Sequence, residues 1–289
     1  MANRFINQAA AGLTSLRPYV PGKPLAELER ELGISGSIKL ASNENPLGPS
    51  PQVRATLEAQ ISDLSRYPDG GAYELRHALA AHHDVDAACV TVGNGSNDVL
   101  DMVARVFLWR GRESLFSQYA FAVYPISSMA VGATLRIVPA VDYGHDLVAM
   151  RAMVTELTGV VWIANPNNPT GTHLGKSALR QFIESVPPQL IVVIDEAYFE
   201  YANDDDFPDA SQWLGDFPNL IVTRTFSKAY GLAALRVGYG LSHPDIADLL
   251  NRVRQPFNVD SFAQAAALAA LQDQDYLRRS VEVNEQGMR

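Results

Sequence analysis

The chain has 289 residues, of which 47% are hydrophobic, and it carries a formal net charge of -9 at pH 7. This apolar content is too high for a disordered chain, and the acidic balance argues against broad binding to nucleic acid or anionic membranes, which need a basic surface. The single cysteine, Cys89, excludes an internal disulfide framework. Because the N-terminus shows no secretory signal pattern and no apolar run approaches about 20 residues, we expect a soluble cytoplasmic protein.

The first 50 residues predict an extended arm. Prolines at positions 18, 21, 24, 46, 49 and 51 exclude a long helix through this part of the chain. One short helix is expected between Pro24 and Gly33, in the segment LAELEREL. We expect the rest of the arm to wrap around a larger body.

From about residue 52, short apolar runs alternate with longer amphipathic stretches. The expected strands are Cys89–Val92, Glu113–Phe116, Thr134–Val138, Val160–Ala164, Leu190–Ile194 and Leu220–Thr223. The expected helices between them are Asn97–Phe107, Ala120–Val131, Leu147–Glu156 and Lys176–Glu184. The runs 160–164 and 190–194 are apolar at every position, as a sheet covered on both faces requires. We therefore predict a three-layer α/β/α domain with a mostly parallel sheet, which binds its ligand at the carboxyl ends of the strands.

The character of the sequence changes after Pro256. An Ala-rich helix is expected around Ser261–Gln272, and a second helix around Tyr276–Gln286. We expect an arm and part of a small domain at 1–50, a large domain at 51–255, and the start of an incomplete C-terminal small domain at 256–289. Because the chain stops within its last expected helix, we expect a fragment of a longer protein.

Two residues that could take part in catalysis or ligand binding follow expected strands. Lys228 lies in Thr225-Phe226-Ser227-Lys228, where it could act as a nucleophile toward a cofactor aldehyde. The alternative is a surface lysine in a polar turn, which is the commoner location for this residue type. Asp195 directly follows an apolar strand, and its carboxylate could hold a cation such as a protonated pyridine nitrogen, or it could cap a helix.

Three weaker patterns occur elsewhere in the chain. The segment from Asn165 to Gly171 has three asparagines and two prolines, which suit either ligand contacts or a tight turn. The segment from Gly93 to Asp98 joins a strand to a helix, where backbone N–H groups can bind an anion. Arg236 is flanked by apolar residues and needs an anionic partner, either a phosphate or a carboxylate of the protein.

In this order, the patterns resemble the pyridoxal-phosphate aminotransferases of fold type I, class I/II, and within these the histidinol-phosphate aminotransferase branch. The motifs that carry the resemblance are Arg17-Pro18-Tyr19, Ser42-Asn43-Glu44-Asn45-Pro46, Arg66-Tyr67-Pro68, Asn165 through Gly171, Asp195-Glu196-Ala197-Tyr198, Ser227-Lys228 and Arg236. They cover the chain from about residue 15 to its end.

The resemblance implies pyridoxal 5'-phosphate as the cofactor. Lys228 would bond to it covalently and later act as general base and acid. Asp195 would keep the pyridine nitrogen protonated, while Asn168 and Tyr198 would contact the ring phenolate oxygen. Tyr119 would stack on the ring. The implied phosphate cup consists of Gly95, Ser96, Thr225, Ser227 and Arg236.

The resemblance also implies a homodimer, because Tyr67 would reach the cofactor phosphate of the neighbouring subunit. Tyr19 and Asn43 would line the substrate pocket. Lys228, Asp195 and Tyr198 would be the catalytic residues, and no metal site is expected, since the sequence shows no cluster of ligands at metal-site spacing.

The implied reaction is transamination between L-histidinol phosphate and 2-oxoglutarate, giving imidazole acetol phosphate and L-glutamate in histidine biosynthesis. The alternatives are an aromatic amino acid aminotransferase of the same fold, a phosphothreonine decarboxylase and a non-catalytic cofactor-binding fragment. In the family, the arginines that hold the substrate's carboxylate or phosphate lie in the C-terminal small domain. The present chain ends before that region, so we expect impaired turnover if Arg289 is its true end.

Overall fold

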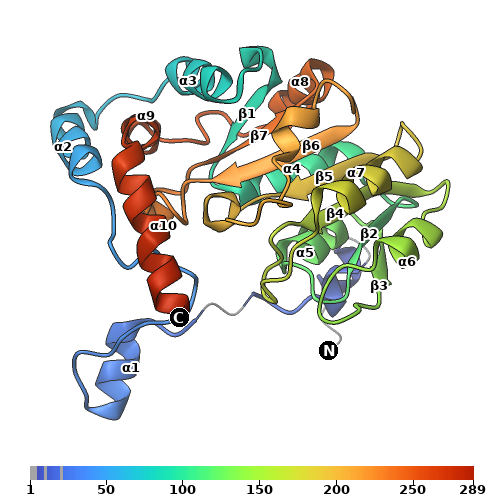
Figure 1. Cartoon of the computed structure of the whole chain (residues 1–289), viewed down its shortest axis with the longest axis horizontal. Helices are drawn as coiled ribbons and strands as arrows, with labels where there is room; N and C mark the ends of the chain where they lie inside the picture. Colours follow the sequence, from blue (N-terminus) through green and yellow to red (C-terminus); the bar gives the residue numbers. More distant parts are fainter. Residues whose placement is uncertain (1–4, 10–11, 20–21) are drawn as a thin grey trace.

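A mixed sheet forms the centre of the structure (Figure 1). The computed structural model describes residues 5–9, 12–19 and 22–289, and in this part of the chain the sheet has seven strands in the order β1-β7-β6-β5-β4-β2-β3. The strands are β1 (Val90–Gly93), β2 (Glu113–Ser117), β3 (Thr134–Val138), β4 (Thr158–Ala164), β5 (Ile191–Asp195), β6 (Leu220–Thr225) and β7 (Gly238–Ser242). Strand β7 is antiparallel to β1 and β6, and all other neighbours are parallel, which confirms the predicted mostly parallel sheet.

Helices cover both faces of the sheet. The helices are α1 (Leu25–Leu32), α2 (Pro51–Gln60), α3 (Tyr73–His83), α4 (Ser96–Phe107), α5 (Val123–Ala130), α6 (Leu147–Ala152), α7 (Lys176–Ser185), α8 (Pro244–Val253), α9 (Ser261–Gln272) and α10 (Gln274–Met288). Side chains of α4, α5 and α8 pack into one core cluster, and those of α2, α3, α6, α7 and α9 pack into the other.

Strand β4 shows why its apolar run is continuous. Val161 and Ile163 point into the core with α3 and α7, whereas Val160 and Trp162 point into the core with α4 and α5. Successive side chains of a strand alternate between faces, so a strand between two helical layers needs apolar residues at every position. The predicted three-layer α/β/α architecture is confirmed.

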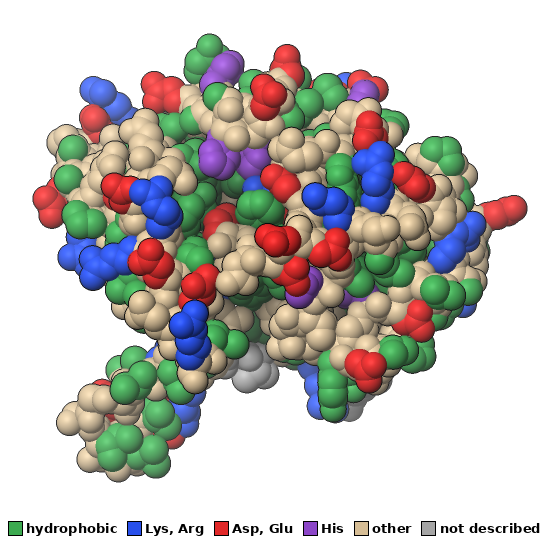
Figure 2. Space-filling model, in the orientation of Figure 1, with side chains coloured by type: hydrophobic (Ala, Val, Ile, Leu, Met, Phe, Trp, Pro, Cys, Tyr) green, Lys and Arg blue, Asp and Glu red, His purple; other side chains and the backbone are tan. Residues whose placement is uncertain are grey.

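The N-terminal arm carries α1 away from the body of the molecule, at the lower left of Figures 1 and 2. None of the α1 residues is buried, and Ile38 and Leu40 beyond it are 85% and 90% exposed. Parts of the expected arm, residues 1–4, 10–11 and 20–21, lie outside the described residues. The expected domain boundaries stay predictions, although α2 packs against α9 from the other end of the chain.

The sequence patterns do not predict α2, α3, α8 or β7. Pro51 occupies the first turn of α2, where its missing N–H costs no hydrogen bond. Among the described residues before it the longest helix is α1, of 8 residues, so the prediction that the prolines exclude a long helix from this part of the chain is confirmed. Strand β7 has glycines where larger residues would be expected. A Cβ on Gly238 would lie 2.3 Å from the backbone nitrogen of Ser96, so glycine permits α4 to approach the strand.

The boundaries of some predicted elements also shift. Cys89 lies in a 3-10 turn that precedes β1 and is not part of the strand. The expected helix 120–131 spans only Val123–Ala130, and the expected helix 147–156 spans only Leu147–Ala152. No helix in the described part of the chain is long and apolar enough to cross a membrane.

A buried ion pair joins the ends of β5 and β6. The Arg224 guanidinium donates two hydrogen bonds to Glu196 Oε2, at 2.9 and 2.7 Å, and one to Asp209 Oδ1 at 2.6 Å. The guanidinium also lies 3.5 Å from the ring centroid of Phe199. Both side chains of the Arg224–Glu196 pair are nearly excluded from solvent, so each charge depends on the other.

We expect Arg224→Met to destabilise the cofactor-free protein by about 3–5 kcal/mol, because it leaves the Glu196 charge buried without its cation. Urea unfolding followed by circular dichroism measures the change. Arg252→Met removes an exposed pair with Asp248 and is the matched control, with an expected loss of less than about 1 kcal/mol. Equal losses in the two variants would contradict the role assigned to the buried pair.

Candidate active site

A cavity of about 540 Å³ opens at the carboxyl ends of the parallel strands. Its walls come from the segments that follow β4, β5 and β6, from the first turn of α4, and from the N-terminal arm at residues 42–44. This is the edge of the sheet at which the alternation of strands and helices predicts a ligand site. Of the expected site residues, Tyr19, Asn43, Ser96, Asn168, Asp195, Tyr198, Thr225, Ser227, Lys228 and Arg236 line the cavity.

Lys228 lies in the loop after β6, with its amine at the cavity wall. Its Nζ donates a hydrogen bond to the carbonyl oxygen of Ser42 at 3.0 Å and lies 5.5 Å from the ring centroid of Tyr198. Burial and the nearby charge of Arg236 lower the pKa of Lys228 below its usual value of 10.5. A lysine with a lowered pKa has a larger neutral fraction, and the neutral amine is the nucleophile.

Asp195 is the last residue of β5, and its side chain is buried. Its Oδ1 accepts a hydrogen bond from the Thr223 hydroxyl at 2.9 Å, and its Oδ2 accepts one from the Tyr124 hydroxyl at 2.8 Å. Burial raises the pKa of Asp195, and these hydrogen bonds oppose that rise. A carboxylate in this position can hold a cationic nitrogen that enters the cavity.

Tyr198 connects the segment after β4 with the N-terminal arm. Its hydroxyl oxygen accepts hydrogen bonds from the side-chain amides of Asn168 at 3.0 Å and Asn43 at 2.9 Å. Burial raises the pKa of Tyr198, so the phenol stays protonated near neutral pH. Since both amides donate to the oxygen, the proton of Tyr198 remains available for an acceptor in the cavity.

Arg236 forms the centre of an anion-binding cup. Its guanidinium donates to the Ser227 hydroxyl at 3.0 Å and to the backbone carbonyl of Ala233 at 3.1 Å. Ser96 opens α4, a helix of 12 residues whose first N–H groups have no partner within the helix. A helix N-terminus, hydroxyl groups and one guanidinium together are suited to bind a phosphate.

Gly95 shows how closely this cup is built. Its backbone has a φ of +77°, and a Cβ at this position would lie 2.5 Å from Nη2 of Arg236. Only glycine combines this backbone conformation with room for the guanidinium. Arg236 itself has a φ of 50°, an uncommon left-handed conformation for a residue with a side chain. The left-handed backbone conformations of Gly95 and Arg236 therefore accompany the close approach of the guanidinium to Gly95.

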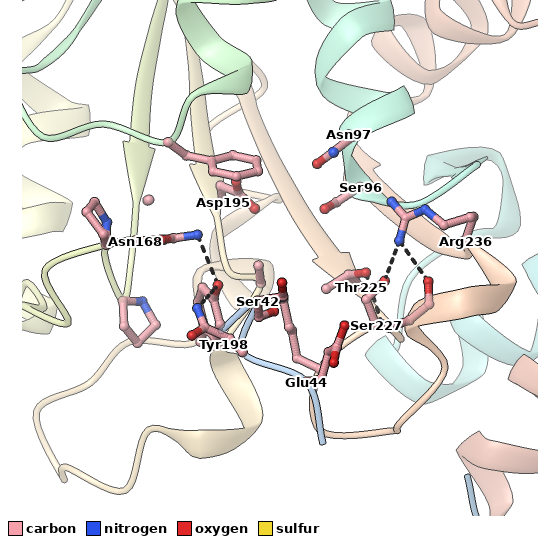
Figure 3. Close-up of a pocket in the computed structure, with 18 of the residues that line it drawn as sticks. Ser42, Glu44, Ser96, Asn97, Asn168, Asp195, Tyr198, Thr225, Ser227 and Arg236 are labelled. Atoms are coloured by element: carbon pink, nitrogen blue, oxygen red, sulfur yellow. Dashed lines mark hydrogen bonds between the residues drawn. The ribbon is translucent and has the colours of Figure 1, made fainter. Parts of the chain in front are cut away.

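The cavity has two chemically distinct sides (Figure 3). Figure 3 shows Asn168 and Tyr198 on one side, Ser96, Thr225, Ser227 and Arg236 on the other, and Asp195 between the two groups. Pyridoxal phosphate offers a ring oxygen, a phosphate and a basic ring nitrogen. The cavity offers hydrogen-bond donors to the ring oxygen and the phosphate and the Asp195 carboxylate as acceptor to the ring nitrogen, and Gly95 leaves the space that the cup requires, so the residues present fit this cofactor.

Three expected site residues, Gly95, Tyr119 and Tyr67, are not among those that line the cavity. The ring of Tyr119 lies beside that of Tyr143, with centroids 5.5 Å apart, and Phe121 from the same segment lines the cavity. The placement of Tyr119 therefore does not support the stacking role expected of it. Tyr67 is 83% exposed, and its ring stacks on Phe257 at 4.7 Å.

Several residues that line the cavity are not among the expected site residues, and Glu44, Asn97 and Phe121 belong to this group. Glu44 lies within the motif Ser42-Asn43-Glu44-Asn45-Pro46, and Phe121 lies two residues beyond Tyr119, so the sequence indicates the right segments for these two residues without identifying their side chains. Among the residues that the structure describes, no group of three or more His, Cys, Asp or Glu side chains is placed to hold a metal ion.

Comparison with known proteins gives consistent results. Residues 35–289 match the family model described as aminotransferase class I and II. The chain is 56% identical over 290 residues to histidinol-phosphate aminotransferase 2 of Pseudomonas fluorescens (strain Pf0-1), covering 100% of this chain and 78% of that protein. It is 53% identical over 277 residues to histidinol-phosphate aminotransferase 1 of Idiomarina loihiensis, covering 96% of this chain and 76% of that protein.

Solved structures show the same architecture. The crystal structure of histidinol-phosphate aminotransferase from Sinorhizobium meliloti in complex with pyridoxal-5'-phosphate has a TM-score of 0.86 and 33% identity, covering 94% of this chain and 73% of that one. Aspartate aminotransferase from Thermus thermophilus with maleate has a TM-score of 0.78 at 22% identity, covering 89% of this chain and 70% of that one. The second likeness concerns the fold alone.

We expect Gly95→Ala to weaken binding of pyridoxal phosphate by roughly tenfold or more, because the new methyl group displaces the Arg236 guanidinium from the cup. A fluorescence titration of the cofactor-free protein measures the dissociation constant. Gly215→Ala is the matched control, since a Cβ there meets no atom within 4 Å. An unchanged dissociation constant in Gly95→Ala would exclude the close approach of Arg236 as a requirement for binding.

Proposed function

Since the chain belongs to the class I and II aminotransferase family, we propose that it transfers the amino group of L-histidinol phosphate to 2-oxoglutarate. The products would be imidazole acetol phosphate and L-glutamate, and the process histidine biosynthesis. The observation that carries the proposal is that Lys228, Asp195 and the cup around Arg236 meet in one cavity, in a chain 56% identical to a histidinol-phosphate aminotransferase.

The protein uses pyridoxal phosphate as its cofactor. When bound, this group supplies the aldehyde that accepts the amino group and the ring that withdraws electrons from the reacting carbon. Arg236, Ser227, Thr225 and the first turn of α4 would hold its phosphate, and the Asp195 carboxylate would hold its ring nitrogen in the protonated form.

Lys228 would be the residue that moves protons. Burial and Arg236 lower the pKa of Lys228, which increases the neutral fraction of its amine, and a neutral amine can take a proton from the substrate Cα. The same amine, once protonated, can return the proton on the other side of the reaction. The hydrogen bond to the Ser42 carbonyl keeps Nζ at the cavity wall.

Tyr198 and Asn168 would bind the ring oxygen of the cofactor. The phenol proton is free to be donated, because its oxygen already accepts from the amides of Asn168 and Asn43. Phe121 supplies an apolar wall to the same cavity, and we propose that its ring, in place of that of Tyr119, packs against the cofactor.

The N-terminal arm would complete the substrate pocket. Tyr19, Asn43 and Glu44 line the cavity beside Lys228. Asn43 has a left-handed φ of 50° and donates its amide to Tyr198, which fixes it relative to the reacting groups. We propose that Tyr19 and Asn43 contact the substrate.

A homodimer and a cytoplasmic location belong to the same proposal. Tyr67 is exposed and lies outside the cavity of its own chain, which suits a role at the phosphate of a neighbouring subunit. The arm exposes Leu32, Ile34, Ile38 and Leu40. Figure 2 shows hydrophobic side chains on the lobe at its lower left, where the arm carries α1. Exposed apolar side chains of this kind are suited to contact another subunit.

The proposed function is tested by the visible absorbance of the purified chain. We expect pyridoxal phosphate to give the band of the lysine-bound cofactor, and histidinol phosphate alone to convert it to the band of the amine form. Phosphothreonine and phenylalanine serve as competing substrates. A lysine-bound band that ignores histidinol phosphate but responds to one of the others would replace the proposed substrate, and a band that ignores all three would indicate an inert fragment.

We expect Asp195→Asn to slow the histidinol phosphate half-reaction by about 10²- to 10³-fold, the scale of losing one preorganised electrostatic contact. An amide cannot neutralise a protonated ring nitrogen, so the ring loses its capacity to withdraw electrons. Stopped-flow absorbance measures the rate. Asp101→Asn, which affects a surface ion pair with Arg105, is the control. A rate in Asp195→Asn equal to that of the control would remove Asp195 from its proposed role.

A further inference from the structure

Asp195 is not held by charge alone, because each of its oxygens has its own hydroxyl donor within the protein. Tyr124 of α5 donates to Oδ2 at 2.8 Å, and Thr223 of β6 donates to Oδ1 at 2.9 Å. The two donors come from different layers of the fold, one from a helix on the sheet and one from the neighbouring strand. Together they fix the plane of the carboxylate from two directions.

Tyr124 is immobilised on every side. It is fully buried, its ring stacks on Trp162 with centroids 5.3 Å apart and planes 11° apart, and the Phe121 ring meets its edge at 5.9 Å. Trp162 is fixed in turn by a hydrogen bond from Nε1 to the Ser114 hydroxyl at 2.8 Å. A side chain packed in this way cannot turn its hydroxyl toward another partner.

The direction of the hydrogen bond follows from burial. Burial and the negative charge of Asp195 raise the pKa of Tyr124 well above 10, so the phenol keeps its proton. Among the described residues, the acceptor of this proton is Oδ2 of Asp195. Hydrogen bonds donated to a carboxylate favour its charged form, so Tyr124 opposes the tendency of burial to neutralise Asp195.

We propose that Tyr124 and Thr223 are positioning residues that keep Asp195 ionised and turned toward the cavity, and thereby set the pH range over which the protein holds its cofactor. This inference rests on the proposed role of Asp195 toward the ring nitrogen. Neither residue touches the cavity, and both act through Asp195. They form a donor pair that the family motifs in the sequence do not reveal.

The other titratable groups around Asp195 are accounted for. Lys228 faces it from the loop after β6 and favours its charged form. Tyr198, from the segment after β5, stays protonated and is occupied by Asn168 and Asn43. Glu196 and Arg224 lie on the opposite face of the sheet, where they pair with each other. The hydroxyl pair is therefore the local influence that a conservative substitution can remove without adding or deleting a formal charge.

The test is the dissociation constant of pyridoxal phosphate for the full chain, measured by fluorescence between pH 5 and pH 8.5. Tyr124→Phe deletes one oxygen atom and leaves the packing intact. We expect affinity at neutral pH to fall roughly tenfold, and the acid-side loss of affinity to move upward by about one pH unit, because Asp195 is protonated more easily without this donor. Thr223→Val should move both quantities in the same direction, and Thr223→Ser, which keeps a hydroxyl, should restore them.

Tyr239→Phe is the matched control, because it deletes a buried tyrosine hydroxyl that bonds to Nε2 of His83 instead of Asp195. We expect it to lower the thermal midpoint of the cofactor-free protein as Tyr124→Phe does, while leaving the pH dependence of cofactor affinity unchanged. If Tyr124→Phe and Thr223→Val both match this control in affinity and pH dependence, the inference is wrong. Thr223→Val carries the test alone if Tyr124→Phe fails to fold.

Asp195→Asn separates this inference from the proposed function. If Asp195→Asn removes the acid-side change in affinity and Tyr124→Phe has no effect, Asp195 keeps its role and only the positioning pair is refuted. If Asp195→Asn itself leaves affinity and its pH dependence unchanged, the proposed role of Asp195 fails first. The inference is supported if the effect of Tyr124→Phe disappears in the Asp195→Asn background.

Discussion

The active site depends on the alternation of side chains at the ends of β5 and β6. Asp195, Thr223 and Thr225 point to the face of the sheet that carries α4 and α5, where the cavity opens. Their neighbours Glu196 and Arg224 point to the other face and form a buried ion pair. Because a slip of one residue in either strand would exchange these sets, the register of β5 against β6, with Asp195 opposite Thr223, is fixed from both faces. The ion pair thus fixes the ends of β5 and β6 on one face of the sheet, and the same strand ends present polar side chains to the cavity on the other face.

A second constraint is the close approach of α4 to the sheet. Cβ atoms on Gly93 and Gly240 would both lie 2.8 Å from methyl groups of Val99, and one on Gly238 would meet the backbone at Ser96. Because these three positions are glycines, the first turn of α4 can pack directly against the strand ends. The unpaired N–H groups of that turn then lie in the same cavity as Arg236, whose left-handed backbone aims its guanidinium at Gly95. The phosphate cup is therefore a consequence of backbone proximity as much as of charge.

The sequence predicts the parts of the molecule whose physics is local. Apolar runs at 160–164 and 190–194 identify central strands, and the polar residues that follow them, Asp195 among them, do lie at one edge of the sheet. Strand β7 is not predicted, because its glycines make room for α4, a segment more than a hundred residues away in the sequence. Helix α2 is not predicted, although Ser50 caps it and Pro51 occupies its first turn. Tyr124 and Thr223 are ordinary residues of a helix and a strand until the fold brings them to Asp195.

Backbone strain in the site also depends on contacts between distant parts of the chain. Ser42, Asn43 and Arg236 have left-handed backbones with φ of 71°, 50° and 50°, and all three line the cavity. Such conformations cost of order 1–3 kcal/mol each and persist where surrounding contacts determine them. Here the contacts are visible: Lys228 binds the Ser42 carbonyl, Tyr198 accepts from Asn43, and Ser227 accepts from Arg236. Each strained residue is thus hydrogen-bonded to a residue proposed to bind the cofactor. These bonds hold the arm and the loop after β6 in position around the cavity. Strand β5 sets the position of Asp195, while these hydrogen bonds set the positions of the arm and of the loop after β6.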